Sequence, residues 1–259
     1  MPKVTTAGSG RPIRRKGGPA PPGSRAGLER EHIAAAAVAV LDADGLAGLS
    51  TRRIAARLGV RSAALYWHVR DKRELLALAA ETLCADMTLP SPHAPARERL
   101  RAIAHEYRRV LLAHRDAARL FAEQPPLGPH RMRLYDAAVG AFVDAGFEDG
   151  AAAAMATFYR NYLLGMIAEE TRHTQLDPAQ ATPAAALAEA LSAMGAGAAA
   201  YPNLRRVADR LAGLRFETMF ELGLGVLLDG IARRRQTSSA VSDHALSRSH
   251  RPPTRPRSR

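Results

Sequence analysis

The stretch 49–69 reads LSTRRIAARLGVRSAALYWHV and decides the fold of the N-terminal part of the chain. The Ser-Thr pair at 50–51 is typical of a helix start, and the apolar residues after it recur at helical spacing, which predicts a short helix ending at Leu58. Gly59 then supplies a sharp turn that a residue with a Cβ resists. A second short helix is expected over 62–68, so the stretch has the form of a helix-turn-helix.

The second helix of this pair carries short polar residues near its N-terminus and a basic flank, which suit the major groove of DNA. Val60 and Leu65 are expected to pack inward. The side chains expected to face outward are those of Arg61, Ser62, Ala64, Tyr66 and His68. Seven Lys and Arg residues lie between Ser50 and Arg73, although a run of charge by itself is more often a solvated face than a binding site.

Helical spacing continues on both sides of this motif. A first helix is predicted over 28–43 and is stopped by Asp44-Gly45. A long helix is predicted from Asp71 to about Met87, and Glu74, three residues after Asp71, completes a start like a capping box.

A proline-rich joint after residue 89 separates this head from a body that also reads as helical. The predicted body helices cover about 97–113, 116–122, 130–145, 149–173 and 204–234. Residues 177–203 are rich in Pro and Ala, and one weak helix is predicted there, over 183–193. No strand pattern or fixed-period repeat is present, so the predicted fold class is all-α.

The net charge of +12, from 37 Lys and Arg against 25 acids, is concentrated at the two ends of the chain. Residues 1–27 hold six basic and no acidic side chains, and residues 236–259 hold five and one. Both segments lack apolar periodicity and are expected to be disordered basic tails. Between them we place a DNA-binding domain with its connecting helix at 28–89, and a ligand-binding and dimerisation domain at 90–235.

Several function classes are excluded by composition. The single cysteine, Cys84, leaves no disulfide framework and no multi-cysteine zinc site, which favours a reduced, cytoplasmic location. No segment reaches the roughly 18 apolar residues of a membrane span. The histidines are scattered over different helices and no nucleophilic triad spacing is present, so neither a metal, a cofactor nor an enzymatic activity is expected.

The head resembles the DNA-binding domain of the tetracycline-repressor (TetR) family over about residues 28–80. The resemblance is carried by Ile-Ala-x-x-Leu-Gly-Val at 54–60, Leu-Tyr-Trp-His-Val at 65–69 and Asp-Lys-Arg-Glu-Leu-Leu at 71–76. The body is similar to the ligand-binding C-terminal domain of the tetracycline-repressor branch. It shares a proline-rich break at 125–129, an Asp-Ala-Gly-Phe segment at 144–147 and a last helix ending Glu-Leu-Gly-Leu-Gly-Val-Leu-Leu-Asp-Gly at 221–230.

This resemblance implies a homodimeric regulator whose two heads read a palindromic DNA operator and whose body binds a small molecule that releases it. Carried over by position, Thr51 and Arg52 would contact DNA from the first helix of the motif. The recognition helix would contribute Arg61, Ser62, Ala64, Tyr66 and His68, with Arg61 reading a base. Lys72 would bind a phosphate at the start of the next helix.

The dimer is expected to form through the helices at 149–173 and 207–232. Gly223 and Gly225 would permit close approach of helices there, or else serve packing within one chain.

The resemblance also implies an effector pocket in the body, but with an altered lining. Where the branch has residues that help hold a magnesium–drug chelate, this chain carries Thr88, Phe121 and Pro125. Tetracycline is therefore not expected, and a hydrophobic, partly aromatic effector without a metal is. The predicted lining residues are Ile103, Tyr107, Leu111, Phe121, Phe142, Met155, Tyr159, Tyr162 and Met166, unless these are ordinary core residues.

Two other function classes compete with a regulator. A non-specific architectural DNA-binding protein would depend on the basic tails. An all-α ligand-binding or enzymatic body without DNA function would require a damaged head, and the head motif is intact. Whether the regulator represses or activates is left open by the sequence, although repression is the expected action.

Overall fold

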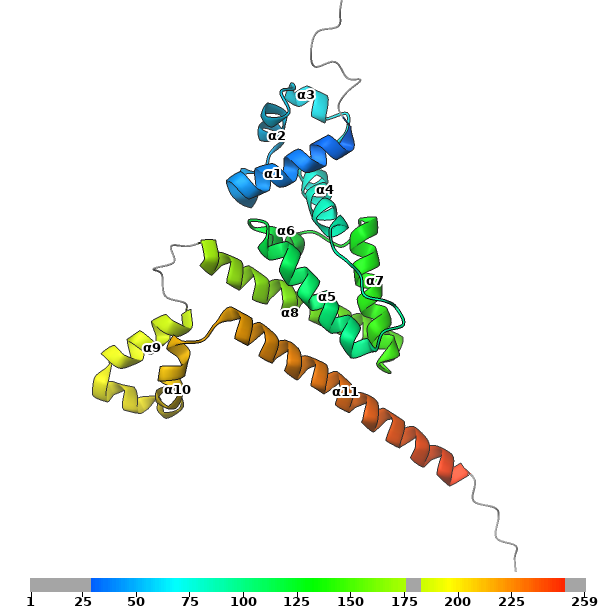
Figure 1. Cartoon of the computed structure of the whole chain (residues 1–259), viewed down its shortest axis with the longest axis vertical. Coiled ribbons are helices and arrows are strands. Elements are labelled where there is room, and N and C mark those ends of the chain that lie inside the picture. The colour runs from blue at the N-terminus through cyan, green and yellow to red at the C-terminus, as the bar shows by residue number, and fades with distance from the viewer. Residues whose placement is uncertain (1–28, 176–182, 250–259) are drawn as a thin grey trace, which may run out of the picture.

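The computed structural model describes residues 29–175 and 183–249, and every element in these ranges is helical (Figure 1). The head holds α1 (Arg30–Gly48), α2 (Thr51–Arg57), α3 (Ser62–Leu65) and α4 (Lys72–Ala85). The body holds α5 (Ala96–Leu112), α6 (Ala117–Glu123), α7 (Pro129–Asp144), α8 (Asp149–Gln175) and α11 (Phe216–Ser249). Between α8 and α11 lie α9 (Pro183–Ala193), the short 3-10 helix η2 (Gly195–Ala200) and α10 (Pro202–Ala212).

The head is organised around fully buried aliphatic side chains from all four of its helices. Ile33 and Leu41 of α1 meet Ile54 of α2, Leu65 of α3 and Leu75 of α4 in one cluster. Each such side chain contributes about 1.5–3 kcal/mol when it leaves water. α1, α2 and α3 are therefore held rigidly against α4, which continues from the head into the body (Figure 1).

The same apolar cluster runs without interruption from the head into the body. Cys84, at the end of α4, is buried in it, and burial raises the pKa of its thiol to about 12. α4 packs on both α6 and α7, and α1 packs on α6. The Cys84 thiol is thus a packing group, and any shift of α6 or α7 acts directly on α4.

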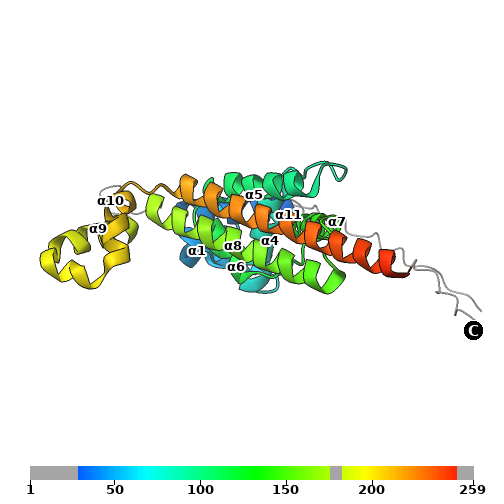
Figure 2. The ribbon, with the colours of Figure 1, turned by 90° about the horizontal axis from the view of Figure 1, so that it is seen from below.

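The body is built from α5, α7 and α8, with Phe142 and Tyr159 at its centre. Their rings meet edge to face with centroids 5.9 Å apart. α11 packs along α5 and α8 and extends beyond the body, as the view from below shows (Figure 2). α9, η2 and α10 pack on one another and form a separate lobe beside the body (Figure 1).

Several helix ends differ from the sequence-based prediction. α3 ends at Leu65 instead of residue 68, because the N–H groups of His68 and Val69 both bond to the Leu65 carbonyl in a turn. The α1 segment reaches Gly48, although helical geometry breaks at Gly45, where a stop was predicted.

The predicted helix 204–234 is two helices, since the chain turns at Gly213 between α10 and α11. α11 then continues to Ser249, past the predicted start of the C-terminal tail at 236, because no Pro or Gly occurs between 231 and 251. The predicted N-terminal tail, 1–27, and residues 250–259 lie outside the described residues. No helix within the described ranges is both long and apolar enough to cross a membrane.

Candidate nucleic-acid interface and ligand cavities

The first helix of the motif, α2, begins with a side-chain cap. Ser50 has extended backbone angles, and its hydroxyl accepts a hydrogen bond from the Arg53 amide at 3.3 Å. This bond satisfies one of the free N–H groups at the helix start. With Ile54 and Ala55 buried against the head core, Thr51 and Arg52 lie on the outer side.

The turn between α2 and α3 has the predicted geometry. Gly59 has a φ of +66°, in the left-handed region that other residues avoid. The Val60 amide then donates to the Ala55 carbonyl at 3.0 Å, which closes the end of α2. Leu65 and Val69 are buried and anchor the recognition segment 61–68 on the core.

None of the eight predicted DNA-contacting residues is buried. Arg52, Arg61, Tyr66 and Lys72 are exposed, and the half-buried members are Thr51, Ser62, Ala64 and His68. Trp67, which the sequence reasoning left out, is 73% exposed beside Tyr66. The preference for exposed aromatic side chains at binding surfaces could have identified it.

A carboxylate fixes the backbone that follows the recognition segment. Glu74 of α4 accepts a hydrogen bond from the Arg70 amide at 2.9 Å and pairs with Arg30 of α1, also at 2.9 Å. Arg30 in turn donates to the His68 carbonyl at 2.9 Å. These hydrogen bonds, first that from the Arg70 backbone, lower the pKa of Glu74 to about 2.

The start of α4 also has the expected cap, with one difference. The Asp71 side chain accepts from the Glu74 amide at 2.8 Å, as predicted. In a full capping box the Glu74 carboxylate would accept a hydrogen bond from the Asp71 amide. Here it accepts from the Arg70 amide instead. The recognition segment is consequently tied to both α1 and α4.

Three consecutive body residues hold the C-terminal end of α1, a contact that sequence reasoning missed. His114 Nδ1 lies 3.0 Å from Asp42 Oδ2, and the Arg115 guanidinium donates to the Ala43 carbonyl at 3.0 Å. Asp116 accepts from the Leu46 amide at 2.8 Å. The head is therefore fastened to the loop before α6 as well as through α4.

The nine predicted effector-lining residues lie in the body, as expected, but mostly in its packed core. Those that are buried are Ile103, Tyr107, Leu111, Phe121, Phe142 and Tyr159, and those that are half-buried are Met155, Tyr162 and Met166. None of the nine lines either of the two cavities described below. Their role toward an effector stays a prediction.

Tyr162 has a clear structural task. Its hydroxyl donates to the Phe220 carbonyl of α11 at 3.3 Å. A Cβ at Gly223 would collide with that hydroxyl, so packing within one chain explains the glycine at 223. Gly225, in contrast, has open space where its Cβ would be.

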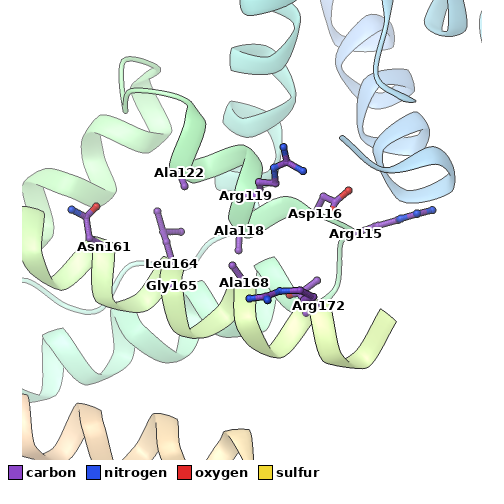
Figure 3. Close-up of a pocket in the computed structure, with 11 residues that line it drawn as sticks. Arg115, Asp116, Ala118, Arg119, Ala122, Asn161, Leu164, Gly165, Ala168 and Arg172 are labelled. Carbon is purple, nitrogen blue, oxygen red and sulfur yellow. The ribbon is translucent and has the colours of Figure 1, made fainter. Parts of the chain in front are cut away.

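A cavity of about 740 Å³ lies between α6 and α8. Ala118 and Ala122 of α6 face Leu164 and Ala168 of α8 across it, and Gly165 adds no side chain (Figure 3). Its polar rim is made by Arg115, Asp116, Arg119, Asn161, Thr171 and Arg172. The small side chains of the two helices thus leave an apolar floor beneath a largely basic rim.

A second cavity of about 760 Å³ lies between α4 and the loop that joins α6 to α7. Its lining combines charged residues of the head, including Arg30 and Glu74, with Gln124 and Arg131 of the body. It is therefore shared by the two parts of the molecule.

The residues at the positions where the resembling branch holds a magnesium–drug chelate do not suit a cation. The Thr88 amide donates to Glu106 at 2.8 Å, and Phe121 is buried with the Arg131 guanidinium 5.2 Å from its ring centroid. A fixed positive charge beside an apolar ring disfavours a metal ion there. Within the described ranges, no three His, Cys, Asp or Glu side chains group as metal ligands.

An apolar strip lies exposed on α8 and α11. Leu222 and Val226 of α11 are 68% and 66% exposed, and Phe158 of α8 is also exposed. The Leu222–Val226 spacing puts both side chains on one face of α11. α8 and α11 lie alongside each other (Figure 2), and each exposes large apolar side chains.

Comparison with known protein families matches both parts of the chain. A model described as "Bacterial regulatory proteins, tetR family" matches residues 33–79. A model described as "Tetracyclin repressor-like, C-terminal domain" matches residues 89–235. The boundary between the two matched regions falls between residues 79 and 89.

Known proteins of similar sequence and structure agree with these matches. The chain is 32% identical to the class C tetracycline repressor protein of Escherichia coli over 231 residues, 83% of this chain and 95% of that protein. The structure of the Streptomyces coelicolor protein ActR in complex with actinorhodin superposes with a TM-score of 0.69 at 29% identity, covering 80% of this chain and 96% of ActR. BioQ with its double-stranded DNA operator gives a TM-score of 0.57 at 25% identity, covering 80% and 99%.

Proposed function

The chain belongs to the tetR family of bacterial regulatory proteins, and we propose that it is a repressor that binds a palindromic operator as a homodimer. A small, mainly apolar effector that binds the body releases it from the operator. The protein acts by binding, without catalysing a reaction.

The observation that carries this proposal is the recognition segment 61–68, which is exposed and yet rigidly held. Leu65 and Val69 anchor it on the head core, and Arg30 and Glu74 fix its C-terminal end. Base reading requires side chains placed on a preorganised backbone, so that little conformational entropy is lost on binding. BioQ, a structural relative, has been solved with its DNA operator.

Within this surface the residues divide into two kinds of contact. Arg61 stands exposed at the N-terminal cap of α3, where a guanidinium reaches guanine O6 and N7 in the major groove. Tyr66 and His68 extend the same surface. Lys72 is exposed in the first turn of α4 and supports a phosphate together with the backbone N–H groups there.

The apolar strip on α8 and α11 supports a homodimer. Leu222 and Val226 lie exposed on one face of α11, and Phe158 is exposed on the neighbouring α8. Exposed apolar side chains that gather in this way are typical of an interface. A two-fold dimer presents two identical heads, which match a palindrome whose half-sites lie about one helical turn apart. Only α11 of the predicted 207–232 segment belongs to this face, since α10 packs on α9.

Release by an effector follows from the way head and body are joined. α4 packs on α6 and α7, and residues 114–116 hold the end of α1. An effector that binds the body better when the heads are wrongly spaced for DNA shifts the population to that state. ActR, a structural relative, has been solved with the small molecule actinorhodin.

Selection of bound sequences from a random duplex pool, at near-physiological salt, tests this function. The full chain is compared with a variant lacking residues 1–27. Enrichment of the same palindrome by both proteins supports a sequence-specific dimer. An architectural DNA-binding protein would instead bind without enriching any sequence, and its binding would be lost when residues 1–27 are removed.

A further inference from the structure

The cavity between α4 and the α6–α7 loop carries an excess of positive charge that the chain does not neutralise. Its acids are Asp71, Glu74 and Glu81, and its bases are Arg30, Arg70, Arg73 and Arg131. Each of the acids is already engaged. Glu74 pairs with both Arg30 and Arg70, Asp71 accepts from the Glu74 amide, and Glu81 accepts from the His130 and Arg131 amides at the start of α7.

Arg131 is the least expected of these bases. The residue is only 4% exposed, and its guanidinium forms no ion pair with any carboxylate in the described part of the chain. It donates to the Gln124 carbonyl and lies over the Phe121 ring. Burial lowers its pKa, and the neighbouring Arg160 lowers it further. An arginine stays charged even so. The buried guanidinium is therefore held by a carbonyl and a ring, with the Glu81 carboxylate nearby but not within ion-pair distance.

A second polar group in the cavity lining lacks a partner. Gln124 is 6% exposed, and its side-chain oxygen accepts no hydrogen bond from the described residues. A buried acceptor left unsatisfied costs about 1–3 kcal/mol, so such groups are rare outside binding sites. An unpaired cation and an unpaired acceptor therefore line one cavity, in adjoining parts of the α6–α7 region.

The rest of the lining is apolar. Ala77 and Leu78 of α4 face it, together with Pro125, Leu127 and Pro129 of the loop. Leu127 is 73% exposed and offers an apolar side chain at the edge of the cavity. A volume of about 760 Å³ lies within the usual range for sites that take drug-sized molecules.

We propose that this cavity binds an amphipathic organic anion, a molecule with an apolar ring system and one carboxylate, sulfonate or phenolate group. The anionic group pairs with Arg131, a donor on the ligand reaches Gln124, and the rings cover Leu78 and Leu127. As an effector site the cavity rests on the proposed function, because its walls belong to α4 of the head and to the α6–α7 loop of the body. Occupation of the cavity would change the position of α4 relative to α7.

Two fluorescent probes with the same rings, one charged and one neutral, distinguish the contribution of charge to binding from that of apolar contact. Anilinonaphthalene sulfonate carries an anion, and N-phenylnaphthylamine is its uncharged counterpart. Both are titrated by fluorescence into the full chain and into Arg131→Met, which keeps an unbranched apolar stem but removes the guanidinium. We expect the sulfonate to bind Arg131→Met about tenfold or more weakly, the effect of losing one charge-assisted hydrogen bond. Binding of the neutral probe should be unchanged.

Leu127 gives a second pair of variants at a surface position where folding is not at stake. Leu127→Glu and Leu127→Lys lose the same apolar contact but bring opposite charges to the cavity. The sulfonate should bind Leu127→Glu more weakly than Leu127→Lys, and the neutral probe should bind both alike. If circular dichroism reports that Arg131→Met is unfolded, this pair decides the question.

Arg119→Met is the matched control, because it makes the same substitution at the other cavity, between α6 and α8. Weakening by this variant and not by Arg131→Met would place the anion in the other cavity and overturn the proposal. Equal losses for both probes in Arg131→Met would also overturn it, because charge would then play no part. So would equal binding of the sulfonate to the two Leu127 variants.

The effect on DNA is measured separately. Saturating sulfonate should lower the affinity of the full chain for its selected duplex, and should do so less in Arg131→Met, as linkage requires. A chain that selects no duplex but binds the sulfonate through Arg131 refutes the proposed function and leaves the site in place. A chain that selects a palindrome but binds the sulfonate independently of Arg131 refutes only the site.

Discussion

Arg61 and Lys72 carry the same charge but lie at different positions in the head, and we expect them to contact different parts of the DNA. Arg61 precedes the recognition helix and is free of ion pairs with other described residues, so its guanidinium is available to a base. Arg53, by comparison, is paired with Asp44. Lys72 lies in the first turn of α4, where backbone N–H groups add to its attraction for phosphate.

These positions predict two different losses. Arg61→Ala should cost about 1–3 kcal/mol of operator binding and relax the preference at one base position in each half-site. Lys72→Ala should weaken binding to all duplexes alike and reduce the salt dependence by about one counterion for each lost contact. Competition against duplexes altered one base pair at a time distinguishes the two. A uniform loss in Arg61→Ala would remove Arg61 from base reading.

Gly45 is the residue at which the head meets the loop before α6. Its φ is +71°, and a Cβ would lie 2.6 Å from the Asp116 carboxylate that accepts from the Leu46 amide. A side chain at this position would therefore strain the backbone and would also displace Asp116 from its hydrogen bond with the Leu46 amide.

Gly45→Ala should accordingly lower the free energy of unfolding by more than the roughly 1–2 kcal/mol of a left-handed backbone alone. Gly59→Ala is the control, since Gly59 has a φ of +66° but no atom near its Cβ position. Urea unfolding of both variants measures the difference. Equal losses would mean that Asp116 moves aside without cost.

At the scale of single elements, the start of α4 is stabilised by a carboxylate that must be ionised. The pKa of Glu74 is lowered to about 2 from an ordinary value of 4.5, first by the Arg70 backbone and then by Arg30. A lowered pKa in the folded state means that Glu74 stabilises the fold above its unfolded pKa. That contribution is lost as the pH falls from about 4.5 to about 2.

The stability of the wild type should therefore fall over this pH range more steeply than that of Glu74→Gln, which has no carboxylate to protonate. Above pH 5 or so the variant should be the less stable of the two. The single tryptophan, Trp67, reports on unfolding of the head close to this site. Parallel pH profiles for the two proteins would show that the pairing with Arg30 and Arg70 does not persist in solution.

The whole molecule depends on the apolar face of α8 and α11. Val226→Glu places a charge on this face and should dissociate the dimer, because a carboxylate buried in an apolar interface has no partner there. Sedimentation velocity should show a monomer with an intact helical content. Affinity for the palindrome should fall sharply, while binding to a single half-site is retained.

The matched control is Val143→Glu, at a valine of α7 that is 42% exposed. It adds the same charge to the body away from α8 and α11 and should leave a dimer. Dissociation by both variants, or by neither, would argue against the α8–α11 face as the dimer interface.

Much of the architecture follows from interactions between residues close together in the chain. The cap at Ser50, the turn at Gly59 and the start of α4 at Asp71 are formed within a few residues, and each was predictable. The order of helices and the all-α class follow likewise from helical spacing. The lengths of α3 and α11 and the turn at Gly213 were not predicted, because residues near helix ends are compatible with more than one conformation.

The remaining features arise between residues far apart in the chain, where no local pattern marks them. Asp116 holds Leu46, Glu81 caps the start of α7, and Arg131 is buried without a carboxylate. The aromatic residues predicted to line an effector pocket are mostly packed in the core, since a helical stripe looks the same whether it faces a ligand or another helix. Local spacing is thus enough to predict a helix-turn-helix head, and the regulator was implied by the resemblance of its motifs. The contacts between head and body, and the cavities beside them, exist only once distant helices are packed together.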